Sequence, residues 1–317
     1  MKLDRIAVLI PCYNESKTIE KVVRDFKKEL PEAVVYVFDN NSDDGADAIA
    51  KEAGAVVFYE KKQGKGNVVR TMFRRINAEC YLMIDGDDTY SASGARVLCD
   101  LVLEENADMV IGDRLSSTYF TENKRLFHNA GNKLVKTLIN MIFKSNVNDI
   151  MTGYRAFSYA FVKSFPSLSK GFEIETEMTI HSLDNNLNII NAAIEYKDRI
   201  PGSESKLNTY TDGYRILKTI FGLYKNYRPY AFFSVLSILL LFVSAAFLAP
   251  VLFDYFQTGL VPRFPSFIAS SFFASAALQS FFAGLILDMI ANKNRRDFEA
   301  KYIERSTQLQ MLKSISE

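Results

Sequence analysis

In Tyr81-Leu82-Met83-Ile84-Asp85-Gly86-Asp87-Asp88-Thr89-Tyr90, an apolar run ends abruptly in three carboxylates that surround a glycine. The run is short and is bounded by an acidic turn, which is typical of a buried strand. Ligands of open α/β sheets bind at the carboxyl ends of the strands. Asp85 and Asp87 flank Gly86, so their oxygens are able to meet at one Mg²⁺ or Mn²⁺ ion that substrate phosphates complete. The alternative is a solvated acidic turn, or a helix cap at Asp88 or Ser91.

The surrounding chain, residues 5–112, alternates short apolar runs with helical periodicity. Strands are predicted at Ile6–Ile10, Val34–Phe38, Ala55–Tyr59, Cys80–Ile84 and Met109–Ile111. Helices are predicted between them at Ser16–Glu29, Asp44–Ala53, Gly66–Asn77 and Ser93–Glu105. This rhythm predicts an α/β fold with a doubly wound, mixed and mostly parallel sheet.

Three further loops follow predicted strands and should line the same crevice as the acidic turn. They are Pro11-Cys12-Tyr13-Asn14-Glu15-Ser16, Asp39-Asn40-Asn41-Ser42-Asp43-Asp44-Gly45 and Gln63-Gly64-Lys65-Gly66-Asn67. A nucleotide fits there, because Asp39 is able to accept from a base N–H and Lys65 at a helix start suits a diphosphate. Each loop alone is weak evidence, since its residues are ordinary turn formers. The chain has no Gly-x-Gly-x-x-Gly and no Walker loop, which argues against dinucleotide binding and ATP hydrolysis.

Composition excludes several other classes of protein. The formal net charge of +1 lacks the basic bias of a nucleic-acid binder. Three widely spaced cysteines, Cys12, Cys80 and Cys99, suggest neither a disulfide framework nor a zinc site. His128 and His181 have no partner motif, so we interpret both as structural or surface residues and expect no Ser-His-Asp chemistry.

Two uncharged stretches predict a transmembrane hairpin. Ala231–Phe253 and Phe267–Leu287 are each long enough to cross a hydrocarbon core of about 30 Å. Basic residues precede the first stretch and follow the second, whereas the connection carries only Arg263. The positive-inside rule therefore predicts a multi-pass protein of the cytoplasmic membrane, with both termini and the catalytic part in the cytoplasm.

The region before the first span predicts an interfacial helix that lies on the bilayer. Tyr210, Tyr214, Leu217, Phe221 and Tyr224 recur at helical spacing on one face, although a core-packed helix is the alternative. The second span is rich in small residues, which predicts close packing on the first span or on another subunit, and hence a possible homo-oligomer. We expect four parts: a catalytic domain (1–207), the interfacial helix (208–229), two transmembrane helices (230–291) and a cytoplasmic tail (292–317).

The motifs resemble those of a known family. Val8-Leu9-Ile10-Pro11-Cys12-Tyr13-Asn14-Glu15, Asp39 to Gly45, Gly64-Lys65-Gly66 and Asp85-Gly86-Asp87 are together similar to the family 2 glycosyltransferases, which have the GT-A fold. The resemblance implies that Pro11, Tyr13, Glu15 and Asp39 bind the nucleoside, and that Asp85 and Asp87 hold the diphosphate and its metal. The full donor set that we expect is Pro11, Tyr13, Asn14, Glu15, Asp39, Asn41, Lys65, Asp85 and Gly86.

The middle of the chain resembles the polyprenyl-phosphate sugar transferases. The matching motifs are Gly112-Asp113-Arg114-Leu115, Arg125 with Asn129, Asp149 to Arg155, and Arg199 to Lys206. Expected acceptor-phosphate residues are Arg114, Arg125, Asn129, Arg199 and Lys206, since arginine forks suit phosphate. Thr89 stands where the mannose-synthase branch has a metal-contacting glutamine, and the Arg-Trp motif of processive members is absent. The first departure disfavours a GDP-mannose donor, and the second disfavours a processive polymerase.

The resemblance implies inverting transfer of one sugar from a nucleotide sugar to a polyprenyl phosphate. Motif similarity favours a UDP donor carrying glucose or N-acetylglucosamine and an undecaprenyl or similar acceptor. Asp87 is the expected catalytic metal ligand, and Asp149 is the candidate base. The roles of Glu173, Glu175 and Glu177 stay open. The alternatives are a GDP-mannose-dependent mannose synthase and, in another class, a non-catalytic membrane-tethered protein that binds sugar nucleotides.

Overall fold

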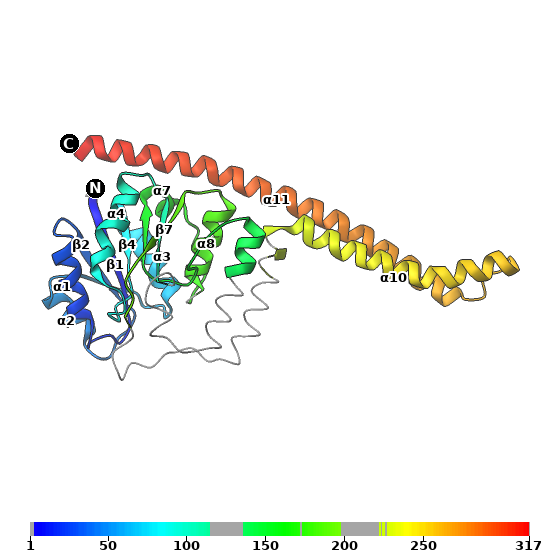
Figure 1. Ribbon diagram of the computed structural model, residues 1–317, viewed down its shortest axis with the longest axis horizontal. Helices are drawn as coiled ribbons and strands as arrows, with labels where there is room; N and C mark the ends of the chain where they lie inside the picture. The colour runs from blue at the N-terminus through cyan, green and yellow to red at the C-terminus, as the bar shows by residue number, and fades with distance from the viewer. Residues whose placement is uncertain are drawn as a thin grey trace. The chain divides into compact units, whose positions relative to one another are not determined.

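The computed structural model describes residues 3–114, 136–171, 173–197, 222, 224–225 and 227–316. The chain divides into two compact units, one formed by Met1–Thr209 with Phe298–Glu317 and the other by Tyr210–Asp297. The first contains a sheet with its helices, and the second contains a pair of long helices (Figure 1). The four-part division expected from the sequence stays a prediction. Most of the expected interfacial helix lies outside the described residues.

The sheet of the first unit has, within the described residues, seven strands in the order β3-β2-β1-β4-β6-β5-β7. Their bounds are β1 Asp4–Cys12, β2 Val34–Asp39, β3 Val56–Tyr59, β4 Ala78–Met83, β5 Met109–Asp113, β6 Arg155–Ser158 and β7 Ile189–Ala193. Strand β1 pairs in parallel with β2 and β4, and β5 pairs in parallel with β7, whereas β6 is antiparallel to β4 and β5. The predicted mixed, mostly parallel sheet is confirmed.

Helices pack against both faces of this sheet. Ile6, Val8 and Ile10 of β1 point to one face and join a buried core with the apolar sides of α1, α2 and α4. On the other face, Phe73 of α3 packs edge-on against Tyr81 and Phe157. The helix bounds are α1 Ile19–Glu29, α2 Ala46–Glu52, α3 Lys65–Arg75, α4 Ala95–Leu103, α7 Tyr159–Ser164 and α8 Ile174–Asp184. Because β1 is buried on both sides, its continuous apolar sequence is the pattern of a central parallel strand.

The polar C-terminal residues are helical and belong to the end of α11 (Phe264–Ser316). Phe298 lies edge-on to the His181 ring of α8, with the ring centroids 4.8 Å apart. Tyr302 donates a hydrogen bond to Asp108, and Lys313 pairs with Glu79. The tail from Phe298 onward and the sheet domain are therefore one folded unit.

His181 gives this unit a predictable pH dependence. Burial lowers the pKa of His181 from 6.5 to about 4, because its neighbours include the rings of Phe161, Phe165 and Phe298. The neutral imidazole therefore favours the fold above pH 6.5, and this stabilisation, up to about 3 kcal/mol, should be lost as the pH falls towards 4. Thermal unfolding of the detergent-solubilised protein between pH 7.5 and 4.5 measures the effect. His181→Leu should flatten that pH dependence, and identical curves for both proteins would contradict the prediction.

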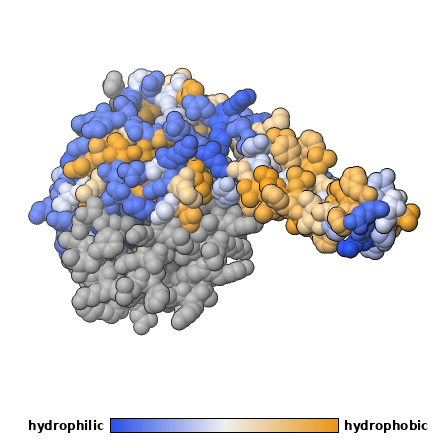
Figure 2. All heavy atoms as spheres, turned by 45° about the vertical axis from the view of Figure 1, so that its right-hand side comes forward, coloured by the Kyte–Doolittle hydropathy of each residue, from blue (hydrophilic) through white to orange (hydrophobic). Residues whose placement is uncertain are grey.

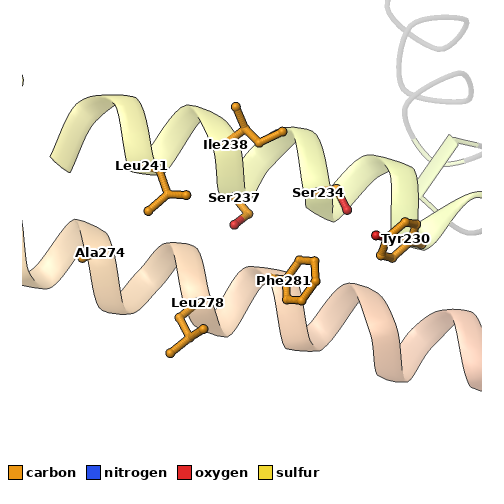
Figure 3. Close-up of a pocket in the computed structure, with 8 residues that line it drawn as sticks. All are labelled: Tyr230, Ser234, Ser237, Ile238, Leu241, Ala274, Leu278 and Phe281. Atoms are coloured by element: carbon orange, nitrogen blue, oxygen red, sulfur yellow. The ribbon is translucent and has the colours of Figure 1, made fainter. Parts of the chain in front are cut away.

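The second unit contains α10 (Pro229–Thr258) and the first part of α11, and both helices are long and apolar enough to cross a membrane. Figure 2 shows hydrophobic residues gathered along this pair of helices. Small residues pack between them: the Ser237 hydroxyl donates to the carbonyl of Ala277 at 2.8 Å, and Gly284 lies against Phe233. The predicted close packing of the second span on the first is thus confirmed. A shallow groove of about 600 Å³ runs between Tyr230 and Leu241 of α10 and Ala274 and Phe281 of α11 (Figure 3).

Candidate active site

The candidate site lies where β1, β2 and β4 end, because these three strands are parallel neighbours. Their loops are tied together by hydrogen bonds. Asn14 donates its backbone N–H to the Ser42 hydroxyl and accepts from the backbone N–H of Asp43, both at 3.0 Å. The Thr18 hydroxyl donates to the carbonyl of Gly86 at 2.7 Å. The loops after β1 and β2 and the acidic turn, which were all predicted to line one crevice, are therefore brought together, and Asn14 joins the first two.

Asp39 holds a buried hydrogen-bond acceptor in this crevice. Its Oδ2 accepts from the backbone N–H of Ser42 at 3.1 Å, whereas Oδ1 is buried and has no hydrogen-bond partner among the described residues. A buried acceptor that lacks a partner costs free energy and is suited to a ligand's N–H. In the loop after β1, Tyr13 is 39% exposed, and Pro11 and Glu15 are half-buried. Asn41 instead donates its side-chain amide to Lys61 and Gln63, which shapes the neighbouring loop.

The three carboxylates of the acidic turn lie in different surroundings. Asp87 is 6% exposed and its Oδ1 accepts from the Thr89 hydroxyl at 2.7 Å and from the Thr89 backbone N–H at 3.3 Å. Asp88 has a positive φ of 56° and pairs with Lys21 at 2.5 Å. Thr89 therefore orients Asp87 in this chain.

Asp85 belongs to a buried ion cluster with Lys65 and Glu175. The Lys65 ammonium contacts Oδ1 of Asp85 and lies 2.6 Å from Oε1 of Glu175. Lys65 is the first residue of α3 and Glu175 lies in the first turn of α8. Burial raises the pKa of Glu175. Burial alone would lower the pKa of Lys65, but the two carboxylates outweigh it and raise this pKa.

Three glycines permit the close approach that this cluster needs. A Cβ atom on Gly153 would lie 2.2 Å from Oδ2 of Asp85. Cβ atoms on Gly64 and Gly66, which flank Lys65, would lie 2.2 and 2.3 Å from the carbonyl oxygens of Lys170 and Ser169. The absence of side chains at these positions lets the chain after α7 pass over Lys65 and lets Gly153 back the Asp85 carboxylate.

Arg114 and Asp149 form a second ion pair beside the first. Arg114 Nε donates to Oδ2 of Asp149 at 2.7 Å, and its guanidinium lies 5.6 Å from the centre of the Tyr196 ring. Asp149 is 2% exposed. Arg155, in contrast, is fully buried and donates to the carbonyls of Ile150 and Thr152 and to Thr179. Asp149 therefore pairs with Arg114, while Arg155 links the loop before β6 to α8.

The other expected acceptor residues, Arg125, Asn129, Arg199 and Lys206, lie outside the described residues. Two residues that the sequence did not assign join the site instead. The sequence does not choose among three alternating acids, but the buried Glu175 contacts Lys65, whereas Glu177 accepts hydrogen bonds from the backbone N–H groups of Leu168 and Ser169. Gly153 lies within a motif that had been related to the acceptor, and no local signal links it to Asp85.

The carboxylates fit a divalent cation that arrives with phosphate. No group of three or more His, Cys, Asp or Glu side chains is arranged to hold a metal ion within the described ranges of the chain. Asp85 and Asp87 nevertheless supply two carboxylates, which is the number that Mg²⁺ or Mn²⁺ commonly uses when substrate phosphates complete the coordination. The Lys65 ammonium already stands as a cation against Asp85. This donor set therefore suits a cation shared with a substrate.

The fold and the loops at its strand ends define a glycosyltransferase of the GT-A fold. Residues 7–165 match Glycosyl transferase family 2, and the chain belongs to this family. The protein is thus a transferase, as the sequence motifs predicted.

Three known proteins illustrate the relationship. Glycosyltransferase AglJ of Haloferax volcanii is 34% identical over 232 residues, which cover 73% of this chain and 76% of AglJ. The dolichyl-phosphate hexose transferase of the same organism is 28% identical over 217 residues, which cover 68% of this chain and 92% of that protein. Glucosyl-3-phosphoglycerate synthase from Mycobacterium tuberculosis, solved with Mn²⁺, UDP and glucosyl-3-phosphoglycerate, superposes with a TM-score of 0.57 at 17% identity over 71% of this chain and 80% of that one. The last likeness concerns the fold.

Proposed function

We propose that the protein transfers one sugar, glucose or N-acetylglucosamine, from its UDP donor to undecaprenyl phosphate or a similar polyprenyl phosphate at the cytoplasmic face of the membrane. One observation carries this proposal: the same chain contains a family 2 site with carboxylates at its strand ends and two apolar helices long enough to cross a membrane. A relative that covers two thirds of the chain is a dolichyl-phosphate hexose transferase, which supports a polyprenyl acceptor.

The donor side of the proposal is supported by Asp39 and Lys65. The unpartnered Oδ1 of Asp39 is suited to accept the ring N–H of uracil. Lys65, at the N-terminus of α3, is suited to bind the diphosphate, because ammonium and helix N-terminus both favour negative charge. A divalent cation on Asp85 and Asp87, when bound, supplies positive charge that offsets the charge growing on the leaving nucleoside diphosphate.

The acceptor side of the proposal uses a nucleophile that needs little activation. A phosphate monoester has a second pKa of about 6, so it is largely dianionic at pH 7. Its oxygen attacks the anomeric carbon while the bond from that carbon to the diphosphate breaks, with inversion. Arg114 is suited to hold this phosphate, and Asp149 to keep the Arg114 guanidinium in place, because Asp149 is buried and bonded to it. A separate base is optional, so Asp149 as a base is the less supported role.

The cytoplasmic orientation is proposed from the charges that flank the apolar helices. Lys225 and Arg228 precede α10, and Lys293, Arg295 and Arg296 follow the apolar part of α11. The connection between the helices offers Arg263, which is paired with Asp254 at 2.8 Å. Cytoplasmic loops carry the excess of lysine and arginine in membrane proteins, so this distribution supports a cytoplasmic catalytic unit.

Membranes that contain the protein should be incubated with labelled UDP-glucose, UDP-N-acetylglucosamine or GDP-mannose, with membranes lacking it as the control. The proposal expects label from one UDP-sugar in the lipid extract, released by mild acid as the free sugar. Label from GDP-mannose alone would overturn the donor assignment. The absence of lipid-linked label from all three donors, with nucleotide binding intact, would favour a non-catalytic binding protein.

A further inference from the structure

The ion cluster at Lys65 has a feature that sugar transfer alone does not require. One ammonium is held between two carboxylates, and the side chains of Lys65 and Glu175 are only 9% and 6% exposed. Asp85 is the most open of the three, at 27%. The described contacts of Lys65 thus include two carboxylates, one at the edge of the crevice and one behind it.

Each carboxylate oxygen of Asp85 has a close neighbour in this arrangement. The Lys65 ammonium contacts Oδ1, and the backbone of Gly153 lies close against Oδ2. A divalent cation that approached alone would have to displace Lys65 from Asp85 or lie beside a second positive charge. Like charges a few ångströms apart repel strongly in a partly buried site, so the contact between Lys65 and Asp85 opposes cation binding.

We propose that Lys65 is an internal counter-ion which blocks Asp85 to divalent cations until a nucleoside diphosphate enters the crevice and offers the ammonium a new partner. Lys65 then leaves Asp85 for a donor phosphate and stays in contact with Glu175. Asp85 becomes available to the cation that accompanies the donor. Glu175 touches no reactant, so it is a positioning residue that acts through Lys65. This inference rests on the proposed function, because it takes a nucleoside diphosphate as the ligand of the crevice.

Coupling between cation and nucleotide is the measurable consequence. Because each ligand removes a cost that opposes the other, Mn²⁺ should bind the wild-type protein at least about tenfold more tightly with UDP than without it. UDP should in turn bind more tightly by the same factor when Mn²⁺ is present, since the coupling is reciprocal.

The test measures Mn²⁺ dissociation constants by electron paramagnetic resonance on the full-length protein in detergent, without nucleotide, with UDP and with GDP. Lys65→Met removes the charge at similar length and should tighten nucleotide-free Mn²⁺ binding by about tenfold, so that the coupling to UDP falls. Lys65→Met leaves Glu175 buried and unpaired, so the double variant Lys65→Met/Glu175→Gln is the second test and should behave likewise. Lys21→Met is the matched control, since Lys21 pairs with the neighbouring Asp88, and it should leave all three constants unchanged.

Glu175→Gln alone should act in the opposite direction. With Glu175 neutral, Lys65 has Asp85 as its remaining anionic partner in the cluster, so nucleotide-free Mn²⁺ binding should weaken by several-fold, and so should binding with UDP. A merely structural role would weaken Mn²⁺ binding in every variant of the cluster. The opposite signs of Lys65→Met and Glu175→Gln therefore distinguish positioning from loss of structure.

The outcomes separate this inference from the proposed function. The inference is overturned if both variants that lack Lys65 bind Mn²⁺ without nucleotide within about twofold of the wild-type affinity. This holds even if UDP still strengthens Mn²⁺ binding. Coupling of Mn²⁺ to GDP but not to UDP would overturn the proposed donor; the inference would then stand if both variants that lack Lys65 lose the coupling to GDP, and would fall if they keep it. Mn²⁺ binding that neither nucleotide strengthens in the wild-type protein would overturn both.

Discussion

Replacing Asp87 by asparagine is expected to reduce sugar transfer by about 10²- to 10³-fold or more while the protein stays folded. Asp87 is 6% exposed, and its Oδ1 accepts both hydrogen bonds from Thr89. The amide oxygen of asparagine is able to accept the same two bonds, so the turn should keep its shape. Only the negative charge is lost, and with it the charge that would hold a divalent cation against the departing diphosphate. Initial rates at saturating donor, together with thermal unfolding, measure the two effects separately.

Asp88→Asn is the matched control for this substitution. Asp88 is the next residue in the same turn, has a positive φ that asparagine tolerates well, and pairs with Lys21. Its loss of charge should change transfer by less than about threefold, because an exposed ion pair contributes little. Equal losses in the two variants would mean that the general charge of the turn matters. Full activity of Asp87→Asn would remove Asp87 from the reaction.

The features that the sequence predicted depend on local patterns. The strand-end loops could be predicted to meet because apolar runs mark parallel strands, and parallel strands place their carboxyl ends at one edge. The observed hydrogen bonds between Asn14 and Ser42, and between Thr18 and Gly86, follow from that geometry. Lys65 could likewise be placed beside the acidic turn, since it opens the helix after β3.

The features that the sequence did not predict depend on contacts between distant segments. Glu175 lies 110 positions after Lys65, and its neighbours Glu173 and Glu177 carry the same charge, so only packing of α8 selects it. Strand β6 has four residues and inserts antiparallel between β4 and β5, an arrangement that no periodicity in so short a segment indicates. The pairing of Asp149 with Arg114 depends on this insertion, because the chain reaches β6 through the Asp149 loop.

The contact of Gly153 with Asp85 is another that the sequence did not predict. Replacing Gly153 by alanine is expected to have the second large effect on sugar transfer. A Cβ atom there would lie 2.2 Å from Oδ2 of Asp85 and 2.7 Å from its carboxyl carbon, so one of the two residues must move. Asp85 is the residue with room to move, because 27% of its side chain is exposed towards the crevice. A displacement of about 1 Å in a catalytic group costs on the order of 10²-fold in rate, so Gly153→Ala should lower transfer by at least that factor. Donor saturation kinetics measure the loss.

A matched control and a double mutant decide whether this loss passes through Asp85. Gly94→Ala adds a methyl group that meets no atom closer than 3.3 Å, so it should keep nearly full activity. In an Asp85→Ala background the clash at Gly153 is gone, and Gly153→Ala should then cost little further activity, since residues in contact give non-additive losses. Losses that multiply in the double mutant would mean that Gly153 acts independently of Asp85. A non-additive result would establish that backbone packing at Gly153, as well as charge, sets where this carboxylate meets the donor.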